Sequence, residues 1–150
     1  MIRITQEADY AVRICCILAR CQKTVGASEI AREACVTQKF ALKILRKLAG
    51  CGIVSSYKGA FGGYRLDRNA DDLNVLEIIE AIEGPLKISK CLDCDHECTK
   101  NPVKDDCKMH HAFMRINDIL TENFKMITVG KLNDRSIGVD DLTGYMKNTE

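Results

Sequence analysis

The chain has 150 residues, of which 46% are hydrophobic and 29% charged. This length suits one well-buried domain, or a small domain plus an oligomerisation element, and excludes two large domains. Up to Asp67 it holds eleven Lys and Arg against five Asp and Glu, whereas the remainder holds eleven against sixteen. A basic half joined to an acidic half indicates a module that binds a polyanion, attached to a sensing or pairing module.

The first residues lack the apolar core of a signal peptide, and no apolar run is long enough to span a membrane. We therefore expect a cytoplasmic protein with no membrane partner. Thr5 can cap a first helix, on which Asp9 and Arg13 have the spacing of an ion pair. Apolar residues at three-and-four spacing predict its inner face: Ala8, Ala11, Val12, Cys15, Leu18 and Ala19.

A helix-turn-helix is predicted next. It consists of a short helix capped by Ser28, a tight connection at Val36 and Thr37, and a basic amphipathic helix. In this motif the second helix enters the major groove of DNA, with its N-terminal residues against the base edges. We expect base contacts from Thr37, Gln38 and Lys39. Phosphate contacts are expected from the outward lysines of the helix, Lys39, Lys43 and Lys47.

A β-hairpin is predicted directly after this helix, with strands at 53–57 and 64–66 around a glycine-rich turn. A hairpin in this place is the wing of a winged helix. Its three glycines allow the backbone to approach a phosphate or a narrow groove, and two basic residues supply positive charge. The candidate DNA contacts in the wing are Lys58, Gly62, Gly63 and Arg65.

Two further helices are predicted, at 73–83 and at 106–127. The second has an apolar stripe formed by Phe113, Ile116, Leu120, Phe124 and Ile127, which Ile119 and Met126 extend. A helix that is apolar on two sides is typical of one that packs against a second copy of itself. We therefore expect a homodimer. The polar tail, 133–150, contains a candidate last helical turn at 140–146.

Four cysteines and three histidines lie between these two helices and at the start of the second, with the spacing Cys91-x2-Cys94-x3-Cys98-x8-Cys107-x2-His110. Thiolates in a polar loop are typical of iron-sulfur and zinc sites. Zinc sites usually pair two C-x2-C arms, and the second arm is missing here, so zinc is the less favoured alternative. A redox disulfide is disfavoured because no βαβ unit is predicted. Three other cysteines are predicted to pack as small apolar residues: Cys21, Cys35 and Cys51.

Together these features resemble the Rrf2 (Rrf-two) family of bacterial transcription regulators, which includes iron-sulfur regulators of the IscR and NsrR types. The matching segments are 4–5, 9–11, 38–40, 43–48, the wing at 59–66, the cysteine loop and 128–132. The resemblance covers roughly residues 1–132. It implies a mainly α, homodimeric winged-helix protein that binds a pseudo-palindromic operator in double-stranded DNA, with neither enzymatic activity nor a small-molecule substrate.

The resemblance also implies one 2Fe-2S or 4Fe-4S cluster per protomer. The cysteine ligands that carry over are Cys91, Cys98 and Cys107, although the intervals here exceed the family's usual five-residue spacing. His110 stands where the IscR type supplies a histidine to a two-iron cluster, and Asp9 stands where the NsrR type supplies an aspartate from the partner subunit to a four-iron cluster. Asp9 is slightly favoured, because IscR-type chains resemble this one less at that position, and Cys94 is a third candidate.

The expected function is therefore a transcriptional regulator whose operator affinity depends on a cluster that senses iron, redox state or nitric oxide. A cluster-free regulator controlled by a protein partner, as in CymR-type relatives, and a zinc-stabilised interaction module are the alternatives. The expected organisation has four parts: a DNA-binding domain at 1–84, a cluster-binding loop at 85–107, a dimerisation helix at 108–132 and a tail at 133–150.

Overall fold

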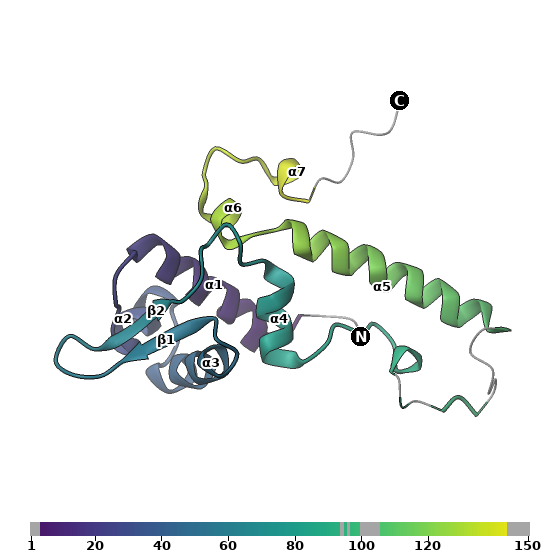
Figure 1. The fold of residues 1–150 in the computed structure, drawn as a ribbon, viewed down its shortest axis with the longest axis horizontal. Helices are drawn as coiled ribbons and strands as arrows, with labels where there is room; N and C mark the ends of the chain where they lie inside the picture. The colour runs from purple at the N-terminus through teal and green to yellow at the C-terminus, as the bar shows by residue number, and fades with distance from the viewer. Residues whose placement is uncertain (1–3, 94, 96, 100–105, 144–150) are drawn as a thin grey trace.

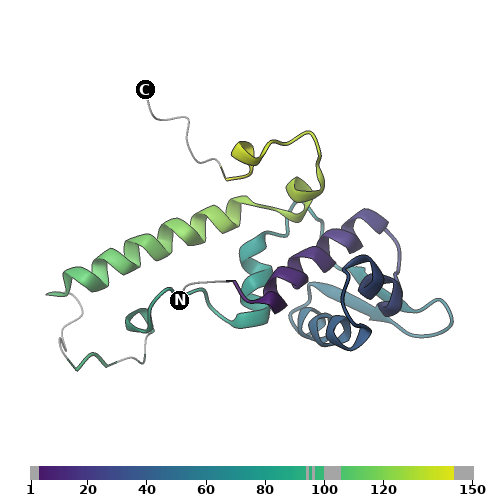
Figure 2. The same cartoon turned by 180° about the vertical axis from the view of Figure 1, so that it is seen from behind.

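The fold consists of a helical lobe and a long helix that extends away from it (Figure 1). A computed structural model describes residues 4–93, 95, 97–99 and 106–143. The elements are α1 (Gln6–Cys21), α2 (Ala27–Glu33), α3 (Gln38–Gly50), β1 (Val54–Tyr57), β2 (Gly63–Leu66), α4 (Val75–Glu83), the 3-10 helix η1 (Lys90–Leu92), α5 (Lys108–Met126), α6 (Val129–Asn133) and α7 (Val139–Leu142). Helices α1 to α4 and the hairpin form the lobe (Figure 2). Helix α5 follows the loop predicted at 85–107, called the cysteine segment below, and runs back to the lobe.

Side-chain caps set the start of the two helices that matter most for the site. The Thr5 hydroxyl accepts a hydrogen bond from the Ala8 amide (3.2 Å) at the start of α1. The Thr37 hydroxyl accepts one from the Phe40 amide (3.2 Å) at the start of α3. Each cap satisfies an amide that has no partner within its helix, which stabilises the fold by about 1 kcal/mol. The cap predicted for Thr5 is confirmed.

The cap predicted for the second helix is wrong. Helix α2 begins at Ala27, and Gly26 occupies the N-cap position without a side-chain hydrogen bond. Ser28 therefore lies inside the first turn rather than before it. The reason is local backbone geometry, since the extended conformation required of an N-cap falls on Gly26, next to the bridge that Val25 makes with the wing.

Helices α1, α3 and α4 bury one face each against a common core. The apolar face of α3 is fully buried, because Ala41, Ile44, Leu45 and Leu48 are each 0% exposed. Cys15 is also fully buried, as predicted, and Ile14 of α1 joins it without having been predicted. Burying a leucine or isoleucine side chain stabilises a fold by about 1.5–3 kcal/mol. This core holds α3, the second helix of the helix-turn-helix, in place.

The wing is a two-stranded antiparallel hairpin that is also tied to the segment before α2. Tyr64 exchanges two backbone hydrogen bonds with Val25: the Tyr64 amide donates at 2.8 Å and the Tyr64 carbonyl accepts at 2.9 Å. A Cβ atom on Gly63 would lie 2.4 Å from the Val25 carbonyl oxygen, and one on Gly62 would lie 2.4 Å from the Tyr57 carbonyl oxygen. Contacts inside the chain therefore require both glycines, a reason that the sequence did not reveal.

Helix α5 lies within the range predicted for the long second helix. One side of it faces α4 and η1: Phe124 packs against the core, and Asn117 Oδ1 accepts a hydrogen bond from the Ile88 amide at 3.0 Å. No residue of α5 is buried in the single chain. Its large exposed apolar side chains are Met109, Met114, Ile116, Ile119 and Met126.

A separate short helix, α6, follows α5 and docks on the lobe, so the segment 108–132 contains two helices rather than one. Val129 is 0% exposed, and its amide donates to the Leu73 carbonyl at 2.9 Å. The Asn133 side-chain amide donates to the Cys16 carbonyl at 3.0 Å. These contacts explain why the chain after α5 turns back toward α1 (Figure 1).

The last described helix, α7, covers the start of the helical turn predicted at 140–146, and residues 144–150 lie outside the described residues. Among the described helices, none combines the length and the apolar character needed to cross a membrane.

Candidate functional site

The first turn of α3 is exposed at the surface of the lobe. Thr37, Gln38 and Lys39 are all exposed, whereas Phe40 turns inward and packs edge-on against Tyr10, with the ring centroids 5.8 Å apart. The amides and the dipole of a helix N-terminus favour negatively charged groups. The structure thus brings the three residues predicted to contact bases together at one accessible helix end.

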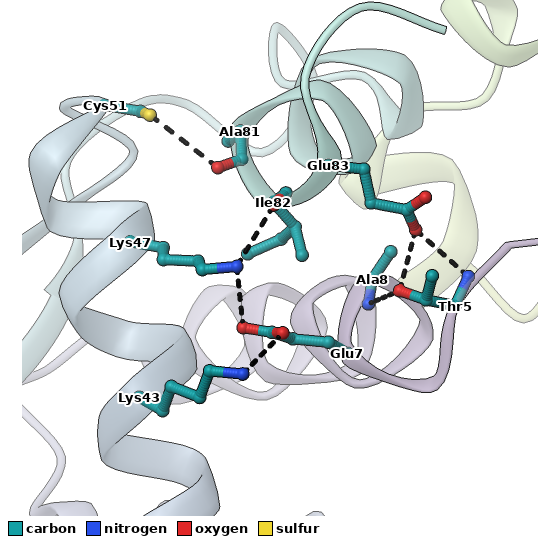
Figure 3. Close-up of polar contacts among 9 residues, drawn as sticks. All are labelled: Thr5, Glu7, Ala8, Lys43, Lys47, Cys51, Ala81, Ile82 and Glu83. Atoms are coloured by element: carbon teal, nitrogen blue, oxygen red, sulfur yellow. Dashed lines mark hydrogen bonds and ion pairs between the residues drawn. The ribbon is translucent and has the colours of Figure 1, made fainter. Parts of the chain in front are cut away.

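Lys43 and Lys47, on the same helix, form ion pairs with Glu7 of α1 (Figure 3). Lys43 Nζ lies 2.8 Å from Glu7 Oε2, and Lys47 Nζ lies 3.0 Å from Glu7 Oε1. Burial by itself raises the pKa of Glu7, but the hydrogen bonds and charges of the two lysines outweigh it and lower that pKa overall. Both ammonium groups therefore have a partner inside the chain, so the phosphate contacts predicted for them would require these pairs to open.

The wing carries exposed charge and an exposed aromatic side chain. Lys58 is exposed, and Arg65 Nη2 donates to the Tyr57 hydroxyl at 3.0 Å, with the guanidinium 5.3 Å from the ring centroid. Phe61, in the turn between the strands, is 96% exposed. Tyr57 and Phe61 were absent from the predicted contacts, although an aromatic residue beside the glycines of a wing turn is visible in the sequence.

The described cysteines of the cysteine segment are half-buried. Cys91 lies in η1, where its Sγ is 3.3 Å from the Ser89 hydroxyl. Cys107 occupies the N-cap position of α5, and Cys98 lies between these two. Cys94 lies outside the described residues. Cysteine sulfur is the usual protein ligand of iron-sulfur clusters, so this donor chemistry fits such a cluster.

His110 has a buried ring nitrogen, Nδ1, that makes no hydrogen bond to the described residues. The ring belongs to the first turn of α5, three residues after Cys107, and packs edge-on against His111 with centroids 5.9 Å apart. Buried polar atoms normally have a partner, and imidazole nitrogen is a common metal ligand. The His110 ring therefore suits the ligand role that was predicted for it.

The described candidates do not converge within one chain. Among the residues that the structure describes, no three His, Cys, Asp or Glu side chains lie close enough to hold a metal ion. Asp9 instead accepts a hydrogen bond from Arg13 Nε at 3.0 Å, which confirms the predicted ion pair and raises the pKa of Arg13. The donor types thus fit a cluster, although within one chain the described candidates lie apart.

The cysteines outside the segment differ in exposure. Burial raises the pKa of the Cys15 and Cys16 thiols, so neither is ready to act as a thiolate ligand. Cys21 is half-buried. Cys35 and Cys51 are exposed, so the prediction of apolar packing is wrong for these two. Both follow helix ends, where the chain turns outward: Cys35 has φ of 55° after α2, and Cys51 caps α3.

Comparisons with known proteins agree with this architecture. The family model Rrf2, described as an iron-dependent transcriptional regulator, matches residues 4–135. The regulator NsrR of Bacillus subtilis is 24% identical, with 99% of this chain and 100% of NsrR covered. The regulator IscR of Enterobacter sp. (strain 638) is 26% identical, with 99% and 90% covered. The solved structure of CymR, the global cysteine regulator of B. subtilis, superposes with a TM-score of 0.70 at 24% identity and covers 89% of this chain and 97% of CymR.

These findings confirm the predicted winged-helix fold. They also agree with the prediction that the chain is a regulator rather than an enzyme, because the matched family and relatives are transcriptional regulators. The hairpin after α3, the exposed first turn of that helix and the family match along most of the chain lead to one conclusion. The chain belongs to the Rrf2 family of transcriptional regulators.

Proposed function

We propose that this regulator reads double-stranded DNA with α3 and the wing, and that an iron-sulfur cluster held by the cysteine segment controls its affinity for the operator. The observation that carries the proposal is the exposed, Thr37-capped first turn of α3, in a chain that belongs to a family of transcriptional regulators. The half-buried thiols and the buried Nδ1 atom of His110 support the cofactor.

DNA contacts divide into two kinds in this proposal. Thr37, Gln38 and Lys39 contact base edges in the major groove, because they occupy the N-terminal turn of the recognition helix. Phosphate contacts come from Lys39 and from the wing, through Lys58, Arg65 and the backbone at Gly62 and Gly63. Two such half-sites about one helical turn apart give a pseudo-palindromic operator.

Substituting one residue of each kind tests this division. Lys58→Ala is expected to weaken binding to every DNA sequence and to reduce the slope of log affinity against log salt by about 1, because one phosphate contact is lost. Gln38→Ala is expected to relax the preference at one base pair, by about 1–3 kcal/mol of discrimination. Titrations of a selected operator and its point variants at several salt concentrations measure both. Equal effects of the two substitutions would contradict the division of roles.

In the cofactor part of the proposal, Cys91, Cys98 and Cys107 supply three thiolates, and His110, Cys94 or Asp9 of a second copy supplies the fourth ligand. An iron-sulfur cluster supplies a group that responds to iron supply, oxygen or nitric oxide. Cys91 follows α4 closely and Cys107 begins α5, so a shared centre would connect the ends of these two helices. Its gain or loss would then reach the DNA-binding lobe through α4.

The exposed apolar side of α5 supports a homodimer. Ile116→Lys is expected to produce monomers, because a charged ammonium would replace an exposed isoleucine in a packed interface. Asp118→Lys is the matched control, since it introduces the same side chain two residues away, on the opposite face of the helix. Light scattering coupled to gel filtration measures the mass. Dimers in both variants would place the interface elsewhere.

A further inference from the structure

The end of α4 is held by three polar contacts to α1 and α3 (Figure 3). Lys47 Nζ donates to the carbonyl of Ile82, in the last turn of α4, at 3.1 Å. The backbone amide and the hydroxyl of Thr5 donate to Glu83 Oε1 at 3.0 and 2.8 Å. Carbonyls in the last turn of a helix have no partner within the helix, so the Lys47 ammonium satisfies one of them. The recognition helix is thereby bonded to the end of α4.

Glu7 holds the ammonium that makes this bond. Its side chain is only 17% exposed and lies between Lys43 and Lys47, which are one turn apart on α3. Two lysines at this spacing repel each other, and the carboxylate between them offsets the repulsion. Without the charge of Glu7, the two ammonium groups would separate and Lys47 would turn toward water. The bond between α3 and α4 would then be lost.

These contacts at the end of α4 also lie close in the chain to the cysteine segment. Gly84 ends α4, and the chain continues from there to Cys91. The recognition helix is therefore bonded, through Lys47, to the helix turn from which the chain continues to the cysteine segment.

We propose that Glu7 is a positioning residue for DNA recognition, which acts through Lys47 to set the recognition helix against the end of α4. This inference rests on the proposed function, because it assumes that α3 reads the operator. Glu7 touches no DNA in this account. It keeps the side chains of the first turn of α3 aligned with the base edges, and it therefore affects how well the protein discriminates between DNA sequences.

If Glu7 acted only through its charge, its removal would change the affinity for the operator in the opposite direction. A carboxylate beside a DNA-binding helix repels phosphates, so its neutralisation would strengthen binding to every sequence alike. A positioning role predicts weaker binding to the operator, with binding to unrelated DNA unchanged or stronger. The ratio of operator affinity to affinity for unrelated DNA separates the two, and a contribution to stability alone would not change that ratio.

The experiment uses the full chain and an operator selected from random duplexes by the wild-type protein. In Glu7→Gln, the ratio of affinity for this operator to affinity for a scrambled duplex is expected to fall about tenfold, which is the discrimination supplied by roughly one base contact. Glu122→Gln is the matched control, because it removes an exposed carboxylate that pairs with Lys125 on α5, and it should leave the ratio unchanged.

Two lysine variants keep the test decisive even where Glu7→Gln folds poorly by circular dichroism. Lys47→Met loses the contacts to both Glu7 and Ile82, whereas Lys43→Met loses only the contact to Glu7. The ratio should fall in Lys47→Met at least threefold further than in Lys43→Met. Equal effects of the two, or an unchanged ratio in folded Glu7→Gln, overturn the inference alone. A wild-type protein that selects no operator overturns the proposed function as well.

Discussion

Replacing Cys98 by alanine is expected to abolish the visible absorbance of the anaerobically purified protein while the dimer persists. The thiolate of Cys98 is one of three that the proposal assigns to the cluster, and an iron-sulfur cluster that lacks one protein ligand is seldom retained. The apolar side of α5 proposed for dimerisation lies outside the cysteine segment, so its contacts remain. Absorption spectra, iron content and mass by light scattering measure the outcome.

Cys51→Ala is the control for this experiment, since that thiol is exposed and lies outside the segment. Its spectrum should equal that of the wild type. Mössbauer spectra of Asp9→Ala and His110→Ala then identify the fourth ligand: a four-iron signature lost in the first, or a two-iron signature altered in the second. A colourless wild-type protein that holds zinc would contradict the sensing mechanism, and a monomeric Cys98→Ala would show that the cluster also supports assembly.

Gly63→Ala is expected to lower the free energy of unfolding by about 3 kcal/mol. Gly63 has φ of 151°, and an added Cβ would lie 2.4 Å from the Val25 carbonyl oxygen. The new methyl group must push the wing away from this segment, which breaks the two backbone hydrogen bonds between Val25 and Tyr64. Urea denaturation followed by circular dichroism measures the loss.

Gly50→Ala provides the comparison, because a Cβ at Gly50 would meet nothing within 4 Å and the residue lies in the last turn of α3. Alanine favours helix over glycine, so this variant should be as stable as the wild type or more stable by up to about 1 kcal/mol. If both substitutions left stability unchanged, the wing would not depend on its contact with Val25.

The amino-acid sequence alone was enough to predict helices α1 to α5 and the wing, but not α6. Those features depend on local chemistry: apolar residues repeat with the helical period, Thr5 can cap the first helix, and glycines mark the turns. For the same reason the exposed first turn of α3 and the polar character of the cysteine segment were visible in advance. The family match then confirmed the fold that these signals indicated.

Only the tertiary structure decided how distant residues meet. Glu7 lies 36 residues from Lys43 in the chain, so no local pattern shows that two lysines predicted to face DNA are paired inside the lobe. The need for glycine at position 63 and the exposure of Cys35 and Cys51 are likewise decided by neighbouring segments and by the direction of the chain at helix ends. Periodicity determines which face of a helix is apolar, whereas the packing of helices against one another determines which charges and backbone atoms come into contact.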